Sequence, residues 1–172
     1  KKSVTETDYA IFNVIADIHL TKKLTFTAKG DYQMTNRRTL SYAKAGLHGE
    51  TDTNGGYADI GNTKSRRWSN EDYFTYADSW FDDQLKSNFG ASWYYNHSEN
   101  SSAGSEQFFD DFFGYHNPGA GTVYHKPSSG MSQQTMNSYY FRMNHTFRDK
   151  YLLGFTLRAD GASNFGANNK YG

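Results

Sequence analysis

Histidines and acidic residues are the side chains of this sequence that could carry metal or acid–base chemistry. None of the 6 histidines has the H-x-x-x-H or H-E-x-x-H spacing that binds zinc on a helix. The acidic pairs Asp82–Asp83 and Asp110–Asp111 are adjacent, so their carboxylates diverge in an extended chain, whereas a glycosidase holds two carboxyl groups about 5–9.5 Å apart. The chain has no cysteine. We therefore expect no metal site, no cofactor and no catalytic residue, and the protein is predicted not to be an enzyme.

An aromatic stretch, residues 104–115, is the best candidate for a binding loop. Ser105 could cap a short helix there. Four phenylalanines would then form one apolar stripe at i, i+4 spacing, namely Phe108, Phe109, Phe112 and Phe113. Such a stripe ordinarily packs onto neighbouring loops. It could also dock a partner protein or stack against a sugar or a peptide.

Three charged residues near the C-terminal end of the sequence are weaker candidates. Arg142, Arg158 and Asp160 fall on the polar side of two predicted strands. We expect them to form charge pairs between strands or to contact another part of the protein. Direct contact with a substrate is the alternative.

The element that must position these charges is a hairpin within residues 137–171. Apolar and polar residues alternate in both arms, 139–147 and 151–159, which predicts two half-buried strands. The apolar faces of paired strands must coincide, because a slip of one residue turns every side chain to the other face. A three-residue turn at 148–150 satisfies this requirement. It pairs Phe147 with Tyr151, His145 with Leu153, Met143 with Phe155, and Phe141 with Leu157.

Two further hairpins are predicted upstream. Residues 9–20 and 24–32 alternate in the same way, and a turn at 21–23 pairs Leu20 with Leu24. The middle hairpin is less regular, because aromatic residues fall on both sides of its first strand. For that hairpin we expect an odd turn near residues 81–83, which puts Tyr73, Thr75 and Ala77 on the apolar face and keeps Asp78 off it.

The three hairpins are predicted at about 9–35, 66–97 and 134–164, and polar loops at about 36–65 and 98–133. Very short turns at one end and long loops at the other are typical of outer-membrane barrels, with periplasmic turns and extracellular loops. A tilted strand needs about 9–11 residues to cross the hydrocarbon, and each arm supplies that length. The fold class is therefore all-β, an antiparallel transmembrane β-barrel segment of about six strands.

Composition agrees with β-structure and excludes one class of partner. Aromatic residues make up 17% of the 172 residues, and 18 basic groups balance 18 acidic groups. A nucleic-acid surface needs a clustered positive field, so no nucleic acid is expected. No run of about 18 apolar residues could form a transmembrane helix, but barrel strands are apolar only at every second position. A soluble secreted β-rich glycan-binding module, with its aromatic faces packed as a sandwich, is the alternative.

One motif resembles a known family. The segment N-S-Y-Y-F-R-M-N-H-T-F-R-D-K-Y-L-L at 137–153, followed by L-R-A-D-G-A-S-N-F-G at 157–166, is similar to the barrel of SusC/RagA-type TonB-dependent transporters of Bacteroidetes. That family has S-Y-x-x-R-x-N-Y-x-x-x-D-K-Y-L-L and then L-R-x-D-G-S-S-x-F-G. His145 stands where the family usually has Tyr, and Ala162 where it has Ser, and neither change disturbs the alternation.

The resemblance implies an outer-membrane importer of oligosaccharides or peptides. Such transporters are energised by TonB, close about 22 strands around a plug, and carry a SusD-like surface lipoprotein over the mouth. The predicted partners are therefore that lipoprotein, TonB, outer-membrane lipid, and a glycan or peptide substrate. About six strands cannot close a barrel of at least eight. We therefore expect this chain to be an internal fragment that supplies wall and loops, without the plug or the TonB box.

Overall fold

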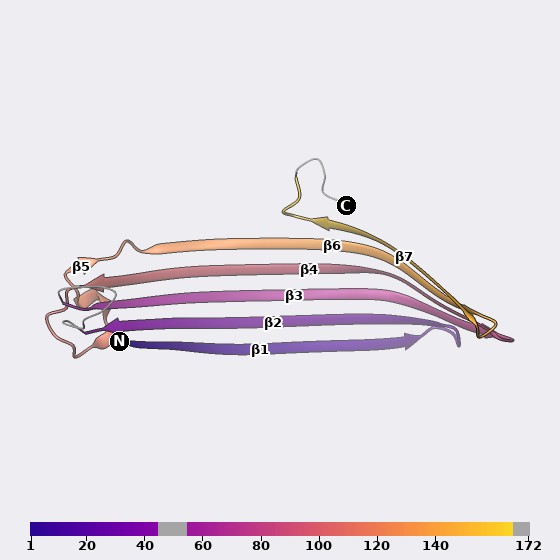
Figure 1. Cartoon of the computed structure of the whole chain (residues 1–172), viewed down its shortest axis with the longest axis horizontal. Helices are drawn as coiled ribbons and strands as arrows, with labels where there is room; N and C mark the ends of the chain where they lie inside the picture. The colour runs from indigo at the N-terminus through magenta and orange to yellow at the C-terminus, as the bar shows by residue number, and fades with distance from the viewer. Residues whose placement is uncertain (45–54, 167–172) are drawn as a thin grey trace. The chain divides into compact units, whose positions relative to one another are not determined.

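The computed structural model describes residues 1–44 and 55–166. In this part the chain forms one β-sheet of seven strands, in which β1-β2-β3-β4-β6-β7 follow one another and β5 pairs with β4 (Figure 1). The strands are β1 (Lys2–His19), β2 (Leu24–Ala43), β3 (Tyr57–Trp80), β4 (Asp83–Glu106), β5 (Val123–Tyr124), β6 (Ser128–Phe147) and β7 (Tyr151–Ala162). The only helices among the described residues are single 3₁₀ turns, η1 (Gly114–His116) and η2 (Pro118–Ala120). No helix there is long and apolar enough to cross a membrane.

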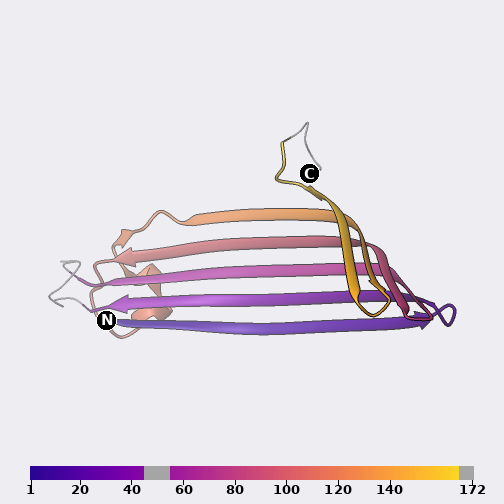
Figure 2. The same cartoon turned by 45° about the vertical axis from the view of Figure 1, so that its right-hand side comes forward.

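The hairpin of β6 and β7 is drawn in orange and yellow in Figure 2. Its register is the predicted one. Phe147 pairs with Tyr151, Met143 with Phe155 and Phe141 with Leu157. The turn is the predicted three residues, and its first two, Arg148 and Asp149, have left-handed backbones with φ of 50° and 48°. The alternation of apolar and polar residues was informative here because only an odd turn brings both apolar faces together.

The predicted odd turn of the middle hairpin is wrong. β3 ends at Trp80 and β4 begins at Asp83, so the turn has two residues, and Phe81 adopts a φ of 49°. Thr75 therefore lies on the polar face, where its hydroxyl accepts a 2.9 Å hydrogen bond from the Asn88 amide. On the apolar face, the ring of Phe74 packs 5.0 Å from that of Phe26.

Asp78 explains why the even turn is tolerated. From the sequence, this carboxylate was predicted not to lie on the apolar face. In the structure it lies next to the turns, where Lys23 Nζ is 2.7 Å away and the Tyr76 hydroxyl donates a 2.9 Å hydrogen bond. A carboxylate at a strand end that has two hydrogen-bond donors is stable there even when it does not lie on the polar face.

The strands extend well beyond the predicted hairpin limits. β2 runs to Ala43, β3 begins at Tyr57, β4 reaches Glu106 and β6 begins at Ser128. Large parts of the predicted loops 36–65 and 98–133 are therefore strand. Polar residues form the backbone hydrogen bonds between strands as well as apolar residues do. Residues 45–54 of the first predicted loop lie outside the described residues.

The chain divides into two compact units. We call residues 1–10, 34–66 and 97–132 the loop-end unit, and residues 11–33, 67–96 and 133–172 the turn-end unit. The loop-end unit has a small core that includes Leu40, Tyr42, Ala58 and Ser105, all buried.

Large apolar side chains of the turn-end unit are exposed. Phe12 and Val14 on β1, and Leu153, Phe155 and Leu157 on β7, keep 45–68% of their surface accessible. These residues share one side of their strands, which we call the apolar face. No described element covers it, so in this part of the chain the sheet has no second layer.

Candidate functional site

The polar face of the turn-end unit is the side of the sheet opposite the apolar face. Hydrogen bonds between strands cover it. On neighbouring strands, Thr27 Oγ1 donates to Asp17 Oδ1 at 2.6 Å. The Ser69 hydroxyl donates to Asp31, and the Arg67 guanidinium donates to Gln33.

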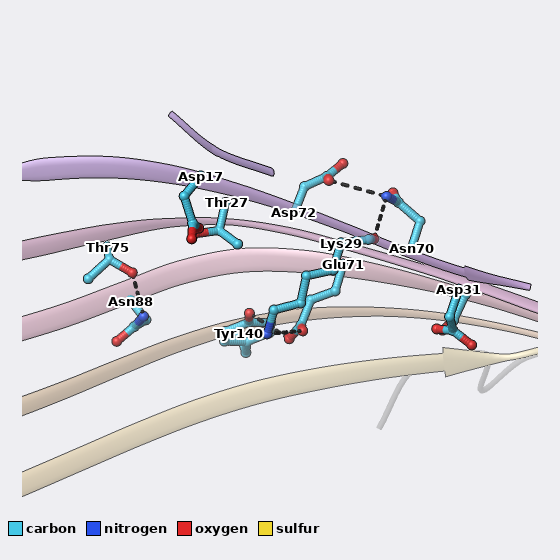
Figure 3. Close-up of polar contacts among 11 residues, drawn as sticks. Asp17, Thr27, Lys29, Asp31, Asn70, Glu71, Asp72, Thr75, Asn88 and Tyr140 are labelled. Carbon is cyan, nitrogen blue, oxygen red and sulfur yellow. Dashed lines mark hydrogen bonds and ion pairs between the residues drawn. The ribbon is translucent and has the colours of Figure 1, made fainter. Parts of the chain in front are cut away.

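Glu71 is the centre of this polar face (Figure 3). Its carboxylate accepts a 2.8 Å hydrogen bond from the Tyr140 hydroxyl and lies 3.6 Å from Lys29 Nζ. Three strands, β2, β3 and β6, thus meet at one carboxylate. Neither Glu71 nor Tyr140 was predicted from the sequence as a site residue. They lie on β3 and β6, and the pattern within one strand does not show which residues of other strands lie beside it.

Arg158 and Asp160 form an ion pair along β7. Arg158 Nε is 2.8 Å from Asp160 Oδ1, and its guanidinium also donates to Ser138 Oγ at 3.2 Å. This ion pair runs along one strand, whereas the prediction was of charge pairs between strands. Arg142, the third candidate, lies on the neighbouring strand opposite Thr156.

A cavity of about 400 Å³ opens on the polar face. Arg142 and Arg158 both line it, together with Lys29, Glu71, Tyr73, Lys86, Asn88, Tyr140, Asn144 and Thr156. The structure therefore brings two of the predicted charged candidates to one site. Asp160 touches the site only through its pair with Arg158.

The predicted helix at the aromatic stretch is wrong. Ser105 does not cap a helix. It is the fully buried penultimate residue of β4, pairs with Tyr124 of β5, and donates its hydroxyl to the Pro118 carbonyl. The chain leaves the strand at Gln107, which has a φ of 60°. Pairing with β5 and the buried hydrogen bond of the Ser105 hydroxyl thus outweigh the local preference for a helix.

Residues 107–122 form a loop that is fixed at both ends to the loop-end unit. The backbone amide of Phe108 donates to the Gly55 carbonyl at 2.8 Å, and that of Thr122 to the Glu106 carbonyl at 3.1 Å. In the middle, Tyr42 donates its hydroxyl to Asp111, whose carboxylate also lies 3.4 Å from Lys44 Nζ. Burial, with the Asp111 carboxylate, raises the pKa of Tyr42 to about 12, so this anchor persists at any physiological pH.

The four phenylalanines do not form one stripe. Phe108 packs edge-on against Tyr42, with ring centroids 6.3 Å apart. Phe109 and Phe112 are 100% and 85% exposed, and Phe113 is half exposed with its ring 5.0 Å from that of Phe112. Of the four, Phe108 packs against the core residue Tyr42, whereas Phe109 and Phe112 keep most of their surface available to a partner or ligand.

His125 is a second anchor that the sequence analysis left among the loop residues. Its Nδ1 lies 2.9 Å from Asp59 Oδ1 and its Nε2 2.8 Å from Glu106 Oε1. Gly104 makes room for this arrangement, because a Cβ there would lie 2.8 Å from His125 Nδ1. A neutral imidazole has only one N–H, so donation to both carboxylates requires the imidazolium. No motif could have predicted the contact, since its three members lie on β3, on β4 and beyond β5.

We expect the His125 anchor to depend on pH. Glu106 first, and Asp59 second, raise the pKa of His125 above its ordinary value of 6.5. The anchor is therefore fully formed below pH 6.5 and is lost as the pH rises through the raised pKa. Cleavage by a broad-specificity protease within residues 107–124 should become faster at pH 9 than at pH 6. In the His125→Gln variant this pH dependence should disappear, and an unchanged dependence would contradict the assignment.

Comparison with known proteins identifies the fold. No protein-family model matches the chain. The chain is 31% identical over 163 residues to TonB-dependent receptor P3 of Formosa agariphila. The aligned residues make up 95% of this chain and 16% of that receptor. The RagAB peptide transporter structure superposes with a TM-score of 0.85 at 22% identity, over 99% of this chain and 19% of that one. The siderophore receptor PiuA from Acinetobacter baumannii gives 0.60 at 14% identity, over 94% and 26%.

These matches confirm the predicted fold class and the predicted resemblance. At such identities the solved structures show the fold alone, and that fold is a segment of a larger transporter barrel. The sequence of this chain is similar, over nearly its whole length, to that of the Formosa receptor. The chain spans about one sixth to one fifth of the length of the receptor and transporter it matches.

Proposed function

We propose that this chain, a barrel segment of the SusC/RagA-type TonB-dependent transporters, forms part of the wall of an outer-membrane importer. In this proposal the apolar face contacts lipid and the polar face lines the interior. The three short turns lie on the periplasmic side, and the loop at residues 107–122 lies on the extracellular side. The chain itself performs no catalysis, in keeping with the receptors and transporters it resembles.

The single observation that carries the proposal is the exposed apolar face. Phe12 and Val14 of β1 and Leu153 of β7 each expose more than 60% of their surface on this face. In water such a face would need a second layer of structure to cover it. In a bilayer it needs none, because the acyl chains cover it. The inner strands β2, β3, β4 and β6 pair their backbones on both sides, and in this proposal the outer edges of β1 and β7 pair with further strands of the transporter.

The substrate and the partners are the finer part of the proposal. We propose import of oligosaccharides or peptides, energised by TonB, in a complex with a SusD-like surface lipoprotein. The likeness to the RagAB peptide transporter supports a peptide or similarly sized solute. Energy coupling would involve parts of the transporter other than this chain.

Fractionation of cells that express the complete transporter tests the proposal. We expect the protein in the outer-membrane fraction, soluble only in detergent, and uptake of a labelled substrate that stops when TonB is deleted. Recovery of the protein from the periplasm or medium without detergent would contradict it and would favour a soluble binding module.

The exposed rings of the 107–122 loop give a prediction for partner binding. Replacing Phe109 and Phe112 together by alanine should weaken binding of the surface lipoprotein about 30-fold or more, because truncation of even one buried aromatic anchor at an interface costs about 2 kcal/mol or more. Co-purification of the lipoprotein with the transporter measures this effect. The matched control is Phe108→Ala, whose ring already packs against Tyr42. If the double variant retains full lipoprotein binding, these rings are not its anchor.

A further inference from the structure

The cavity on the polar face carries an excess of positive charge. Four cationic residues line it, Lys29, Lys86, Arg142 and Arg158, and one anionic residue, Glu71. Glu71 is engaged by Lys29 and Tyr140, and Asp160 at the margin is engaged by Arg158. The acidic groups therefore compensate only two of the four cations.

Lys86 and Arg142 are the two cations left over. Within the described residues, neither has an ion pair or a hydrogen bond to a protein side chain. Both are exposed, and both line the same cavity from paired neighbouring strands, β4 and β6. Two adjacent cations without counter-charges repel each other, and a bound anion relieves that repulsion.

The other lining groups suit an oxyanion attached to a polar ligand. Asn88, Asn144 and Thr156 supply amide and hydroxyl donors, and the guanidinium of Arg142 offers a planar fork that matches two oxygens of a carboxylate or sulfate. A volume of about 400 Å³ lies in the range of small-ligand sites. The register opposite β7 holds Arg142 beside Thr156, so the donors are placed before a ligand arrives.

We infer that this cavity binds the carboxylate or sulfate group of an anionic ligand, with Lys86 and Arg142 as its charge partners. The inference rests on the proposed function, since it makes the polar face a selectivity element of the importer. It predicts a preference for acidic over neutral solutes of equal size.

Binding to the complete, purified transporter tests the inference. The probes are two matched pairs: a uronic-acid trisaccharide with its carboxyl-reduced neutral form, and a glutamate-containing tripeptide with its glutamine form. Isothermal titration should give an affinity for at least one acidic probe about tenfold above that of its neutral partner. The affinity of the acidic probe should fall as salt is raised. The pair that shows the preference identifies whether sugar or peptide carries the charge.

The variant Lys86→Gln with Arg142→Gln should bring the affinities of the acidic and neutral probes within about twofold of each other. Lys22→Gln, at a turn of the same unit outside this cavity, is the control and should keep the tenfold preference. Equal binding of acidic and neutral probes by the unaltered protein would overturn the inference. So would a preference that survives in the double variant.

A third result would also overturn it. If the double variant destabilises the transporter without changing any probe affinity, then a carboxylate of the protein itself occupies the cavity. These outcomes are independent of the proposed function, because the titration uses purified protein and requires neither membrane location nor uptake. A transporter that imports without charge preference would refute only this inference.

Discussion

Replacing Phe155 by arginine is expected to destabilise the folded barrel by about 2–4 kcal/mol. Phe155 is the fifth residue of β7 and lies on the apolar face, 45% exposed, opposite Met143 and with its ring 6.3 Å from that of Phe141. A crossing strand needs about 9–11 residues, so this position lies near the middle of the bilayer. An arginine on the lipid side at that depth costs about 2–4 kcal/mol.

The matched control puts the same cation on the other face. Thr156→Arg changes the next residue of the strand, which lines the polar cavity. Its side chain would lie opposite Arg142, and two like charges across a strand pair cost up to about 1 kcal/mol. The sign and size of the difference between the two variants therefore report which face contacts lipid.

Urea titration of the transporter folded into lipid vesicles measures both variants. We expect the free energy of unfolding to fall by about 2 kcal/mol or more for Phe155→Arg and by less than about 1 kcal/mol for Thr156→Arg. In cells, the fraction of transporter that resists unfolding by detergent before heating should fall in the same order. A Phe155→Arg protein that assembles as well as Thr156→Arg would refute the lipid-facing assignment of β7.

The sequence was most informative where one face is uniformly apolar. In β6 and β7 every second residue from Phe141 to Phe147 and from Tyr151 to Leu157 is apolar or His145, so only an odd turn fits. The middle hairpin lacked this uniformity, because Phe74 and Tyr76 compete with Tyr73 for the apolar side. The prediction then depended on a single carboxylate, Asp78, whose partner Lys23 comes from another hairpin.

The candidate site was only partly predictable for the same reason. Alternation places Arg142 and Arg158 on the polar face, but a pattern within one strand does not show which residues of the next strands lie beside them. Lys86 and Glu71 enter the site only through the registers of β3, β4 and β6. At the other candidate site, the phenylalanines favour a helix locally, but the buried hydroxyl of Ser105 and its β5 pairing decide the backbone there.

Gly90 is the subject of the second large prediction, because the Tyr73 side chain and the Tyr140 ring of the polar face lie against it. A Cβ at this position would lie 2.5 Å from the Cβ of Tyr73, 2.8 Å from the carbonyl oxygen of Asp72 and 2.9 Å from the ring of Tyr140. Two of these three contacts are with atoms fixed to the backbone of β3, so the substitution cannot be relieved by a side-chain rotation alone.

Gly90→Ala should therefore separate β4 from its neighbours or displace the Tyr140 ring, whose hydroxyl donates to Glu71. Overpacking of this kind costs about 1–3 kcal/mol. Gly30→Ala is the matched control, since a Cβ at Gly30 meets no atom within 4 Å. It should be neutral or slightly stabilising, because alanine restricts the unfolded chain more than glycine does.

The same urea titration distinguishes the two glycines, and the cavity provides a second readout. If Gly90 keeps Tyr140 over the polar face, Gly90→Ala should also reduce the affinity of the acidic probe, since the ring and Glu71 line the site beside Arg142. Gly30→Ala should leave that affinity unchanged. Equal folding free energies for the two variants would show that Tyr73 and Tyr140 do not pack against Gly90, and the arrangement of the cavity derived from those rings would then be incorrect.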